Sequence, residues 1–495
     1  MGKMYGAITG AVSQLIGTVA PGAAMNYIRR RSALAGYAAA SRSGPNKAWR
    51  PSNQSADQLI KSDHKMLRAR ARSLARDSSH VSGALRKITN NVVFKGIHPQ
   101  ARLKTQAGDL KDTQNDRAEY HFRRWAEAVG LREKEQLVLR HLWTDGELFA
   151  HWFFDPDLLE QGIIPLGLEL LECDHLDTSR GSLSGGDANI KQGIEYNDRG
   201  RPVAYWLYPE HPGDSTWLSM SGSKRYPAET ITHIFIRERI SQNRGVPWLT
   251  SIIMEMRDFS EYQNAERIAA RLAAAFGIFV TIPYPEQFGS GVSPIGGDGE
   301  TMNADNLPDY LEPGRIQPLP PGMDIKAASY ERPGQTYEPF TKTTLRGAST
   351  GAGMSYEAYS NDYTDASYAS ARSASLEERR GYQVQQSFLL RMLHQQAWDR
   401  LFELNQLSRT DSLPRFIPVV WQVPGWPWVD PDKDSKAAER DIKNGLNSRH
   451  KVCMERGSDY EEIIQDLQRE ADDGFPIGGE DTPAQQEEIQ NDNED

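Results

Sequence analysis

One short stretch of this sequence combines the residue types that bind metals. Asp174, His175 and Asp177 stand within four consecutive positions, and carboxylate and imidazole groups are common zinc ligands. No second group at ligand spacing accompanies them in the sequence. We therefore predict a hydrogen-bonded turn and no bound metal, with a metal site as the alternative.

Motifs of the common catalytic sites are missing from the sequence. It holds no GxxxxGK[ST] phosphate loop, no GxSxG nucleophile turn and no HExxH pair. Four further histidines are isolated, as packed or surface histidines usually are: His141, His151, His233 and His394. The sequence predicts a protein that is not an enzyme and needs no cofactor, and an enzyme stays as an alternative.

A tyrosine-rich segment at residues 351–369 is the stretch around which the chain is organised. It reads GAGMSYEAYSNDYTDASYA, without Lys or Arg, and a helical pattern follows it to about residue 410. Glycines near its start allow backbone movement. We expect a mobile loop before a long helix, and the simpler interpretation is a surface loop that leads into a core helix.

A basic stripe decorates a predicted helix that runs from about residue 57 to residue 91. Its members are Arg68, Arg70, Arg72, Arg76, Arg86 and Lys87. Such a stripe can contact nucleic-acid phosphates or an acidic neighbouring subunit. The alternative is a solvated helix face.

The elements that must position these residues are mainly helical. Apolar residues recur every three or four positions in four stretches, which are predicted as helices: 57–91, 114–142, 247–280 and 370–410. Residues 148–240 hold short apolar runs between turn residues and are predicted as a β-rich region. Residues 281–335 are rich in Pro and Gly, and a long segment of this kind is usually functional or disordered.

The C-terminal part has its own pattern. Short helices are predicted within residues 430–470, where Asp430-Pro431 and Ser448 are helix-start signals. A helix-turn-helix DNA reader is one interpretation, although acidic residues match or outnumber basic ones there. Residues 471–495 are predicted to be disordered.

Charge is distributed unevenly along the 495 residues, whose formal net charge is −10. Residues 1–105 hold 18 Lys and Arg against three Asp, whereas residues 471–495 hold nine Asp and Glu and no Lys or Arg. The two cysteines, Cys173 and Cys453, fit no disulfide or metal pattern, which suits a reducing compartment.

The first 50 residues are predicted as a flexible arm. Residues 4–28 carry no charge and are rich in Ala and Gly, but polar residues, glycines and a proline interrupt them. A signal peptide and a membrane span are the alternatives, and we predict no membrane association.

Four pieces of the sequence resemble the lambda-type family of tailed-phage portal proteins, in the order in which that family carries them. The pieces are LRARARSLARDSSHVSGALRKITNNVV, NRGVPWLTSIIMEM, MSYEAYSNDYTDASYASARSASLEERR, and PGWPWVDPDKDSKAAERDIKNGLNSRHKVCMERGSDYEE. Together they span roughly residues 50–470. The last two pieces are the more specific ones.

The resemblance implies an α+β, mainly helical portal fold with wing, stem, clip and crown, assembled as a ring of usually twelve subunits around a central channel. The parts that it implies are a wing (51–246), a stem helix (247–280), a clip (281–335), a second stem helix (336–350), a tunnel loop (351–369), a wing spine helix (370–410), and a wing-to-crown segment with crown helices (411–470). The arm at 1–50 and the tail at 471–495 lie outside it.

The resemblance also implies a role: packaging and ejection of double-stranded DNA through the ring at one capsid vertex of the virion. The implied partners are the terminase large subunit, a head-tail connector or adaptor, and the major capsid and scaffold proteins, with assembly in the host cytoplasm. The residues implied to face DNA are Tyr356, Tyr359, Ser360, Asn361, Asp362, Tyr363, Thr364, Asp365 and Tyr368. The alternative function is a sequence-independent DNA-binding protein that uses the basic N-terminal region.

Overall fold

The computed structural model describes residues 48, 51–105, 108, 110–181, 189–214, 222–275, 279–280, 317–318, 336–408 and 410–473. The chain divides into two units, residues 1–59 and 60–495, and the second unit holds every described strand and nearly all of the described helices. The predicted arm (1–50), the predicted clip (281–335) and the predicted acidic tail (471–495) fall almost wholly outside the described residues. None of the described helices is both long and apolar enough to cross a membrane.

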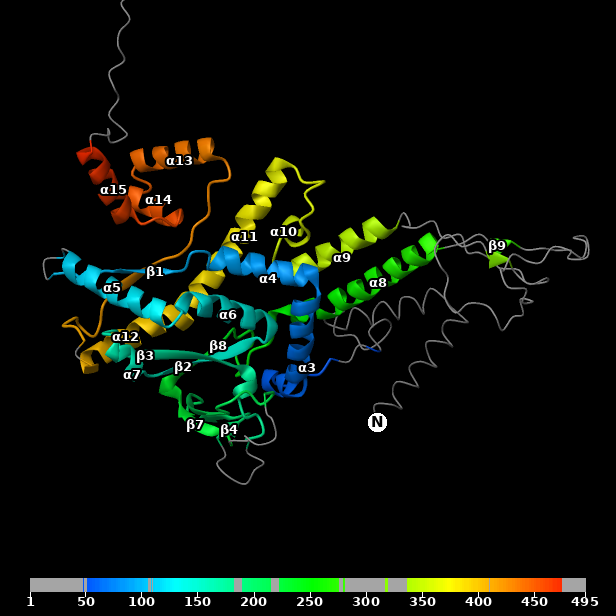
Figure 1. Cartoon of the computed structure of the whole chain (residues 1–495), viewed down its shortest axis with the longest axis horizontal. Helices are drawn as coiled ribbons and strands as arrows, with labels where there is room; N and C mark the ends of the chain where they lie inside the picture. The colour runs from blue at the N-terminus through cyan, green and yellow to red at the C-terminus, as the bar shows by residue number, and fades with distance from the viewer. Residues whose placement is uncertain are drawn as a thin grey trace, which may run out of the picture. The chain divides into compact units, whose positions relative to one another are not determined.

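The described residues form an α+β fold that is mainly helical, as predicted (Figure 1). Its helices are α3 (Ala56–Asp77), α4 (Ser79–Val92), α5 (Asp112–Ala128), α6 (Leu131–Thr144), α7 (Pro156–Glu160), α8 (Ile253–Ala275), α9 (Tyr337–Gly351), α10 (Tyr356–Ser360), α11 (Tyr368–Leu389), α12 (Gln395–Ser408), α13 (Pro431–Lys443), α14 (Arg449–Glu455) and α15 (Tyr460–Asp472).

Two predicted helices are each divided in two by a local signal. Ser78 separates α3 from α4, and its hydroxyl caps α4 by accepting a hydrogen bond from the backbone N–H of Val81. Gly130 separates α5 from α6 with a φ of +62°, a conformation that favours glycine. The predictions of single helices at 57–91 and 114–142 were wrong at these two residues.

The predicted β-rich region forms two antiparallel sheets. The first has the strand order β3-β2-β8 and the second the order β4-β5-β6-β7. The bounds are β2 (Glu147–Phe154), β3 (Leu166–Glu172), β4 (Ile190–Lys191), β5 (Ile194–Tyr196), β6 (Pro202–Leu207), β7 (Lys224–Pro227) and β8 (Ile231–Phe235). A separate pair joins β1 (His98–Ala101) to β11 (Val419–Gln422), and a two-residue pair joins β9 (Phe279–Val280) to β10 (Gln317–Pro318).

The β3-β2-β8 sheet is the middle layer of this region. Figure 1 shows α6 and α12 on one side of it and β4 and β7 on the other. Successive strand residues face opposite sides, so Leu148 and Trp152 enter the main core while Phe149 packs against Tyr205 of β6 at a ring-centroid distance of 5.6 Å. Because its side chains alternate between the two faces of the sheet, β2 contributes residues to both hydrophobic cores.

Helices α8 and α9 lie side by side and confirm that helices follow Pro247 and precede residue 351 (Figure 1). Tyr262 of α8 contacts the rings of Tyr337 and Phe340 of α9 at centroid distances of 5.9 and 4.6 Å. At the C-terminal end of α9, only glycine fits at position 351, because a Cβ there would lie 2.4 Å from the side chain of Ile252. This close approach fixes where α9 meets the start of α8.

The predicted long helix at 370–410 is present as α11 and α12, joined by one π-helical turn (Leu390–His394). Trp398 of α12 is fully buried against Phe122 of α5, with ring centroids 5.4 Å apart. Its indole N–H donates to the carbonyl of Ile417 at 2.8 Å. The C-terminal half of this helix is therefore a core element.

The C-terminal helices α13, α14 and α15 confirm the helices predicted within 430–470 and the cap at Ser448. The Ser448 hydroxyl accepts from the N–H of Lys451 at 3.1 Å. None of the residues of α13 to α15 is buried. Polar contacts attach α15, such as the hydrogen bond from Gln100 to Asp459 at 3.0 Å.

Candidate functional site

The tyrosine-rich segment 351–369 is folded as a short helix between two turns and is not an irregular loop throughout. Gly353 takes a φ of +65° after α9. Ser355 then caps α10 by accepting from the N–H of Ala358 at 3.1 Å, and Asn361 ends that helix with a φ of +60°. Ser367 caps α11 in the same way. These caps explain why small polar residues alternate with tyrosines here.

Asp362 organises the turn after α10. Its carboxylate accepts hydrogen bonds from the Tyr356 hydroxyl at 2.8 Å and from the backbone N–H of Thr364 at 3.1 Å. The hydrogen bond from the Thr364 hydroxyl and that from Tyr356 lower the pKa of Asp362 to about 2. The group is therefore a carboxylate at neutral pH and holds the turn in one shape.

The exposed face of this segment presents hydroxyls and one carboxylate. Tyr363 and Tyr368 are 58% and 60% exposed, and Thr364 and Asp365 lie between them on the surface. Asp365 accepts from the Lys342 ammonium of α9 at 2.9 Å, and Glu338 lies 3.0 Å from the same ammonium. The nearby positive charge of Lys342 is thus matched by two carboxylates.

Tyr359 departs from the prediction that it faces DNA. Its side chain is only 3% exposed, and its hydroxyl donates to the sulfur of Met256 in α8 at 3.3 Å. Its ring stacks on His80 of α4 at a centroid distance of 6.2 Å, and burial raises its pKa. The position of Tyr359 on the inner side of α10 makes it a packing residue in this structure.

The predicted basic stripe and the residues predicted to face DNA contact each other through Lys87. Its ammonium donates to the side chain of Asn361 and to the backbone carbonyl of Ala358, so α4 is tied to the end of α10. On the other side, the backbone N–H of Ser355 donates to Glu378 of α11 at 2.6 Å. The segment is therefore held between α4, α9 and α11.

The basic stripe divides into engaged and exposed members. Arg72 binds Asp145 at 2.5 Å, Glu172 at 2.8 Å and Asp174 at 2.7 Å, and Arg68 is buried 3.3 Å from Asp174. Both side chains are therefore occupied within the chain. Three residues of the stripe are exposed: Arg70, Arg76 and Arg86.

The predicted turn network around Asp177 is confirmed. Asp177 accepts hydrogen bonds from the hydroxyls of Ser179 at 2.5 Å and Ser223 at 2.6 Å. Nδ1 of His175 lies 2.9 Å from the carbonyl oxygen of Tyr208. These contacts close the turn with hydrogen bonds.

Asp174 instead belongs to a group with Glu172 and His211, whose potential ligand atoms lie within 4.8 Å of one another. Arg72 donates to both carboxylates of this group. A guanidinium therefore already supplies the positive charge that a cation would bring.

A buried ionic cluster around Glu147 escaped the sequence prediction. Glu147, fully buried, pairs with Arg244, accepts from the backbone N–H of Gly245 at 2.8 Å and lies 3.0 Å from His233. Burial alone would raise the pKa of Glu147, but Arg244 and His233 outweigh it and hold the pKa well below its usual range. The cluster fixes the chain before α8 onto the β3-β2-β8 sheet.

A sequence profile decides the family. The profile described as "Phage portal protein, lambda family" matches residues 42–386, which is more than half of the chain. The chain belongs to the lambda family of phage portal proteins. The resemblance predicted from four sequence pieces is thereby confirmed.

Curated portal proteins match nearly the whole chain. A probable portal protein of Halomonas phage phiHAP-1 is 28% identical over 462 residues, which cover 87% of this chain and 86% of that protein. The portal protein of Escherichia phage N15 and portal protein B of Escherichia phage lambda are each 22% identical. Both matches cover 86% of this chain, and they cover 88% and 87% of the relatives.

Chains from gene transfer agent (GTA) particles are among the similar solved structures. A chain of the virion of the native GTA particle is 12% identical with a TM-score of 0.35, covering 83% of this chain and 95% of its own. A chain of the neck of the empty GTA particle is 12% identical with a TM-score of 0.37, covering 78% and 93%. These similarities are too low to support an argument, and the family assignment rests on the sequence match.

Proposed function

We propose that this portal-family chain closes into a ring of twelve subunits at one capsid vertex, and that double-stranded DNA passes through the ring during packaging and ejection. Under this proposal the parts are a wing (51–246), stem helices (247–280 and 336–350), a clip (281–335), a channel-facing segment (351–369), a wing spine (370–410) and a crown (411–470). Nothing in this role requires an active site.

The observation that carries the proposal is that two cations beside residues 351–369, Lys342 and Arg372, are paired with carboxylates. The exposed Arg346 instead lies over the ring of Tyr356, at 5.2 Å from its centroid. A channel that passes DNA must not hold it, and affinity for a duplex rises with the number of Lys and Arg that reach its phosphates. Lys342 is matched by Asp365 and Glu338, and Arg372 is paired with Asp434 at 2.7 Å. The exposed hydroxyls of Tyr363 and Tyr368 can exchange weak contacts with phosphates in any register.

A closed ring also needs one repeated heterologous contact between subunits. The exposed arginines of α3 and α4, Arg70, Arg76 and Arg86, suit an acidic face of a neighbouring subunit or packaged DNA. We place the terminase large subunit and the head-tail connector or adaptor at the outer end of the ring. The major capsid and scaffold proteins would surround its wing during assembly in the host cytoplasm.

The experiment that tests the proposal is DNA packaging into particles that carry an Asp365→Lys portal. This substitution removes one of the two carboxylates that pair with Lys342 and adds a second cation at an exposed position, so packaging should slow severalfold. The double variant Asp365→Lys with Lys342→Glu reverses the ion pair and should restore the rate. Asp116→Lys, at an exposed position of α5, is the matched control. Unchanged packaging by correctly assembled Asp365→Lys rings would overturn the proposal.

A further inference from the structure

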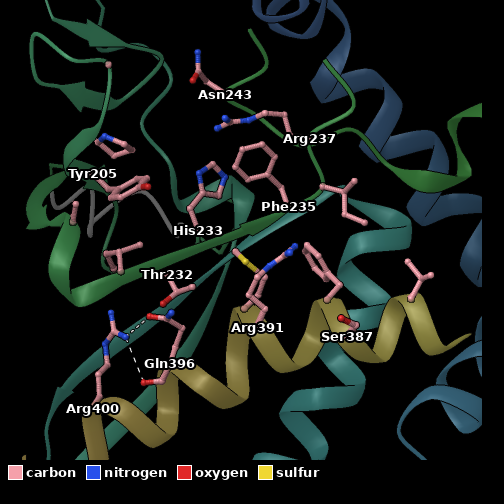
Figure 2. Close-up of a pocket in the computed structure, with 18 of the residues that line it drawn as sticks. Tyr205, Thr232, His233, Phe235, Arg237, Asn243, Ser387, Arg391, Gln396 and Arg400 are labelled. Atoms are coloured by element: carbon pink, nitrogen blue, oxygen red, sulfur yellow. Dashed lines mark hydrogen bonds between the residues drawn. The ribbon is translucent and has the colours of Figure 1, made fainter. Parts of the chain in front are cut away.

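A groove of about 1140 Å³ runs between the β-rich region and the long helix formed by α11 and α12. In Figure 2, Arg391 and Arg400 rise from the helix toward the strand that carries Thr232 and His233. The residues that line the groove include four arginines and no carboxylate: Arg237, Arg380, Arg391 and Arg400. The groove is therefore basic in a chain whose net charge is negative.

The positive charge of the groove is poorly neutralised within the chain. Among the residues that the structure describes, neither Arg237 nor Arg391 makes an ion pair, and each lies only beside an aromatic ring, of Phe235 and Phe388 respectively. Arg380 lies 3.4 Å from Glu377, and because both side chains are nearly four-fifths exposed this pair is weak. An anionic partner would thus meet available guanidinium groups.

Arg400 lies deeper in the groove and hydrogen bonds to uncharged acceptors. It donates to the carbonyl of Glu229 at 3.0 Å. Figure 2 shows its hydrogen bonds to Gln396, whose side-chain oxygen accepts at 2.5 Å. Burial lowers its pKa, although Asp399 and Glu403 of the same helix act in the opposite direction. A partly desolvated cation of this kind gains from an added carboxylate.

The floor of the same groove is apolar. Val384 of α11 is 68% exposed although it lines the groove, while Phe388 is buried and Met392 half-buried behind it. Exposed apolar side chains within a concave surface are typical of a peptide-binding groove. The occupant should therefore carry both carboxylates and apolar side chains.

Residues 474–495 of this chain have that composition. They hold seven carboxylates and no Lys or Arg, and they begin with Gly474-Phe475-Pro476-Ile477. Phe475 and Ile477 follow Asp473, the last described residue, by two and four positions, so they reach only about 7 and 14 Å beyond it. Figure 1 shows α15 away from β8 of the same chain, so only the groove of a neighbouring copy is within their reach. We propose that the acidic C-terminal segment 474–495 binds in this arginine-lined groove of a neighbouring copy, with Phe475 and Ile477 on its apolar floor. Duplex DNA, the other polyanion, offers no side chains that would cover that floor.

Photo-crosslinking in the full-length chain tests this binding. A photo-reactive amino acid in place of Val384 should crosslink to residues 474–495, and peptide mapping by mass spectrometry identifies the site. The pair Arg380→Glu and Arg391→Glu should lower the crosslink yield about fivefold, since each exposed ion pair contributes modestly. Replacing the seven carboxylates of the segment by amides should lower it similarly. The pair Arg123→Glu and Arg140→Glu, at exposed positions of α5 and α6, controls for net charge.

A charge exchange makes the test independent of folding defects. Lysines in place of the seven carboxylates should restore crosslinking in the Arg380→Glu and Arg391→Glu chain. Crosslinks from position 384 to other segments would overturn the proposal. A crosslink yield that stays the same when the charge of residues 474–495 is changed would also overturn it. Crosslinking that is independent of the tail and blocked by added duplex DNA would assign the groove to phosphates instead.

Discussion

The ammonium of Lys87 in α4 donates a hydrogen bond to the side chain of Asn361, which lies 274 residues further along the chain. It also donates to the carbonyl of Ala358, so one side chain satisfies two acceptors at the end of α10. Asn361 has a φ of +60°, which is uncommon for residues other than glycine. We infer that Lys87 stabilises the shape of segment 351–369 from outside it.

Replacing Lys87 should therefore loosen the segment. In a Lys87→Ala chain, backbone amides of residues 355–365 should exchange hydrogen for deuterium faster, since the end of α10 loses both contacts. Arg86→Ala is the matched control, because Arg86 is the exposed neighbour of Lys87 on the same helix. Equal exchange rates in the two variants would show that Lys87 does not hold the segment.

Tyr359 should behave as a core residue and not as a DNA-facing one. Tyr359→Ala should lower the free energy of unfolding by about 3 kcal/mol, as for other buried aromatic side chains. Tyr363→Ala, at a position that is 58% exposed, should change it by about 0.5 kcal/mol or less. Urea unfolding followed by tryptophan fluorescence compares them, and similar midpoints would place Tyr359 outside the core.

The buried pair of Glu147 and Arg244 should show the penalty of an uncompensated charge. Glu147→Gln keeps the size of the side chain but leaves Arg244 without its carboxylate, which should cost about 3–5 kcal/mol of stability. The same change at Glu195, whose partner Arg225 is 45% exposed at its side chain, should cost about 1 kcal/mol or less. The double variant Glu147→Gln with Arg244→Met should lose less than Glu147→Gln alone.

Stability should fall as the pH drops from about 6.5 to about 4. Burial lowers the pKa of His64 to about 4, with Arg244 and Arg68 adding to the effect and Glu147 opposing it. Over this pH range the unfolded chain binds a proton on His64 that the folded chain does not, so up to about 3 kcal/mol of stability is lost. His64→Gln should flatten the fall of melting temperature with pH, while the buried His233 keeps part of it. An identical pH profile in the variant would contradict this assignment.

Sequence spacing predicted the elements well where local signals dominate. The caps at Asp430 and Ser448 and the β-rich region follow from neighbours within a few positions of each other. The helix ends at Ser78 and Gly130 also depend on local signals. They were not predicted because the helical spacing of apolar residues continues through both positions.

The contacts that define the site could not be predicted in the same way. Glu147 meets Arg244 across 97 residues, and His394 lies 2.9 Å from Glu135 inside the core. Isolated histidines in a sequence carry no sign of such partners. Tyr359 likewise shares its residue type with its exposed neighbours, and only the side of α10 on which it lies separates them.

Assembly into a ring is tested by the mass and symmetry of the purified protein, measured by native mass spectrometry with electron-microscopy class averages. We expect a closed ring near twelve subunits with a central hole, because the proposed channel exists only in such a ring. A monomer or dimer at micromolar concentration, unchanged when the scaffold protein is added, would contradict the proposed function.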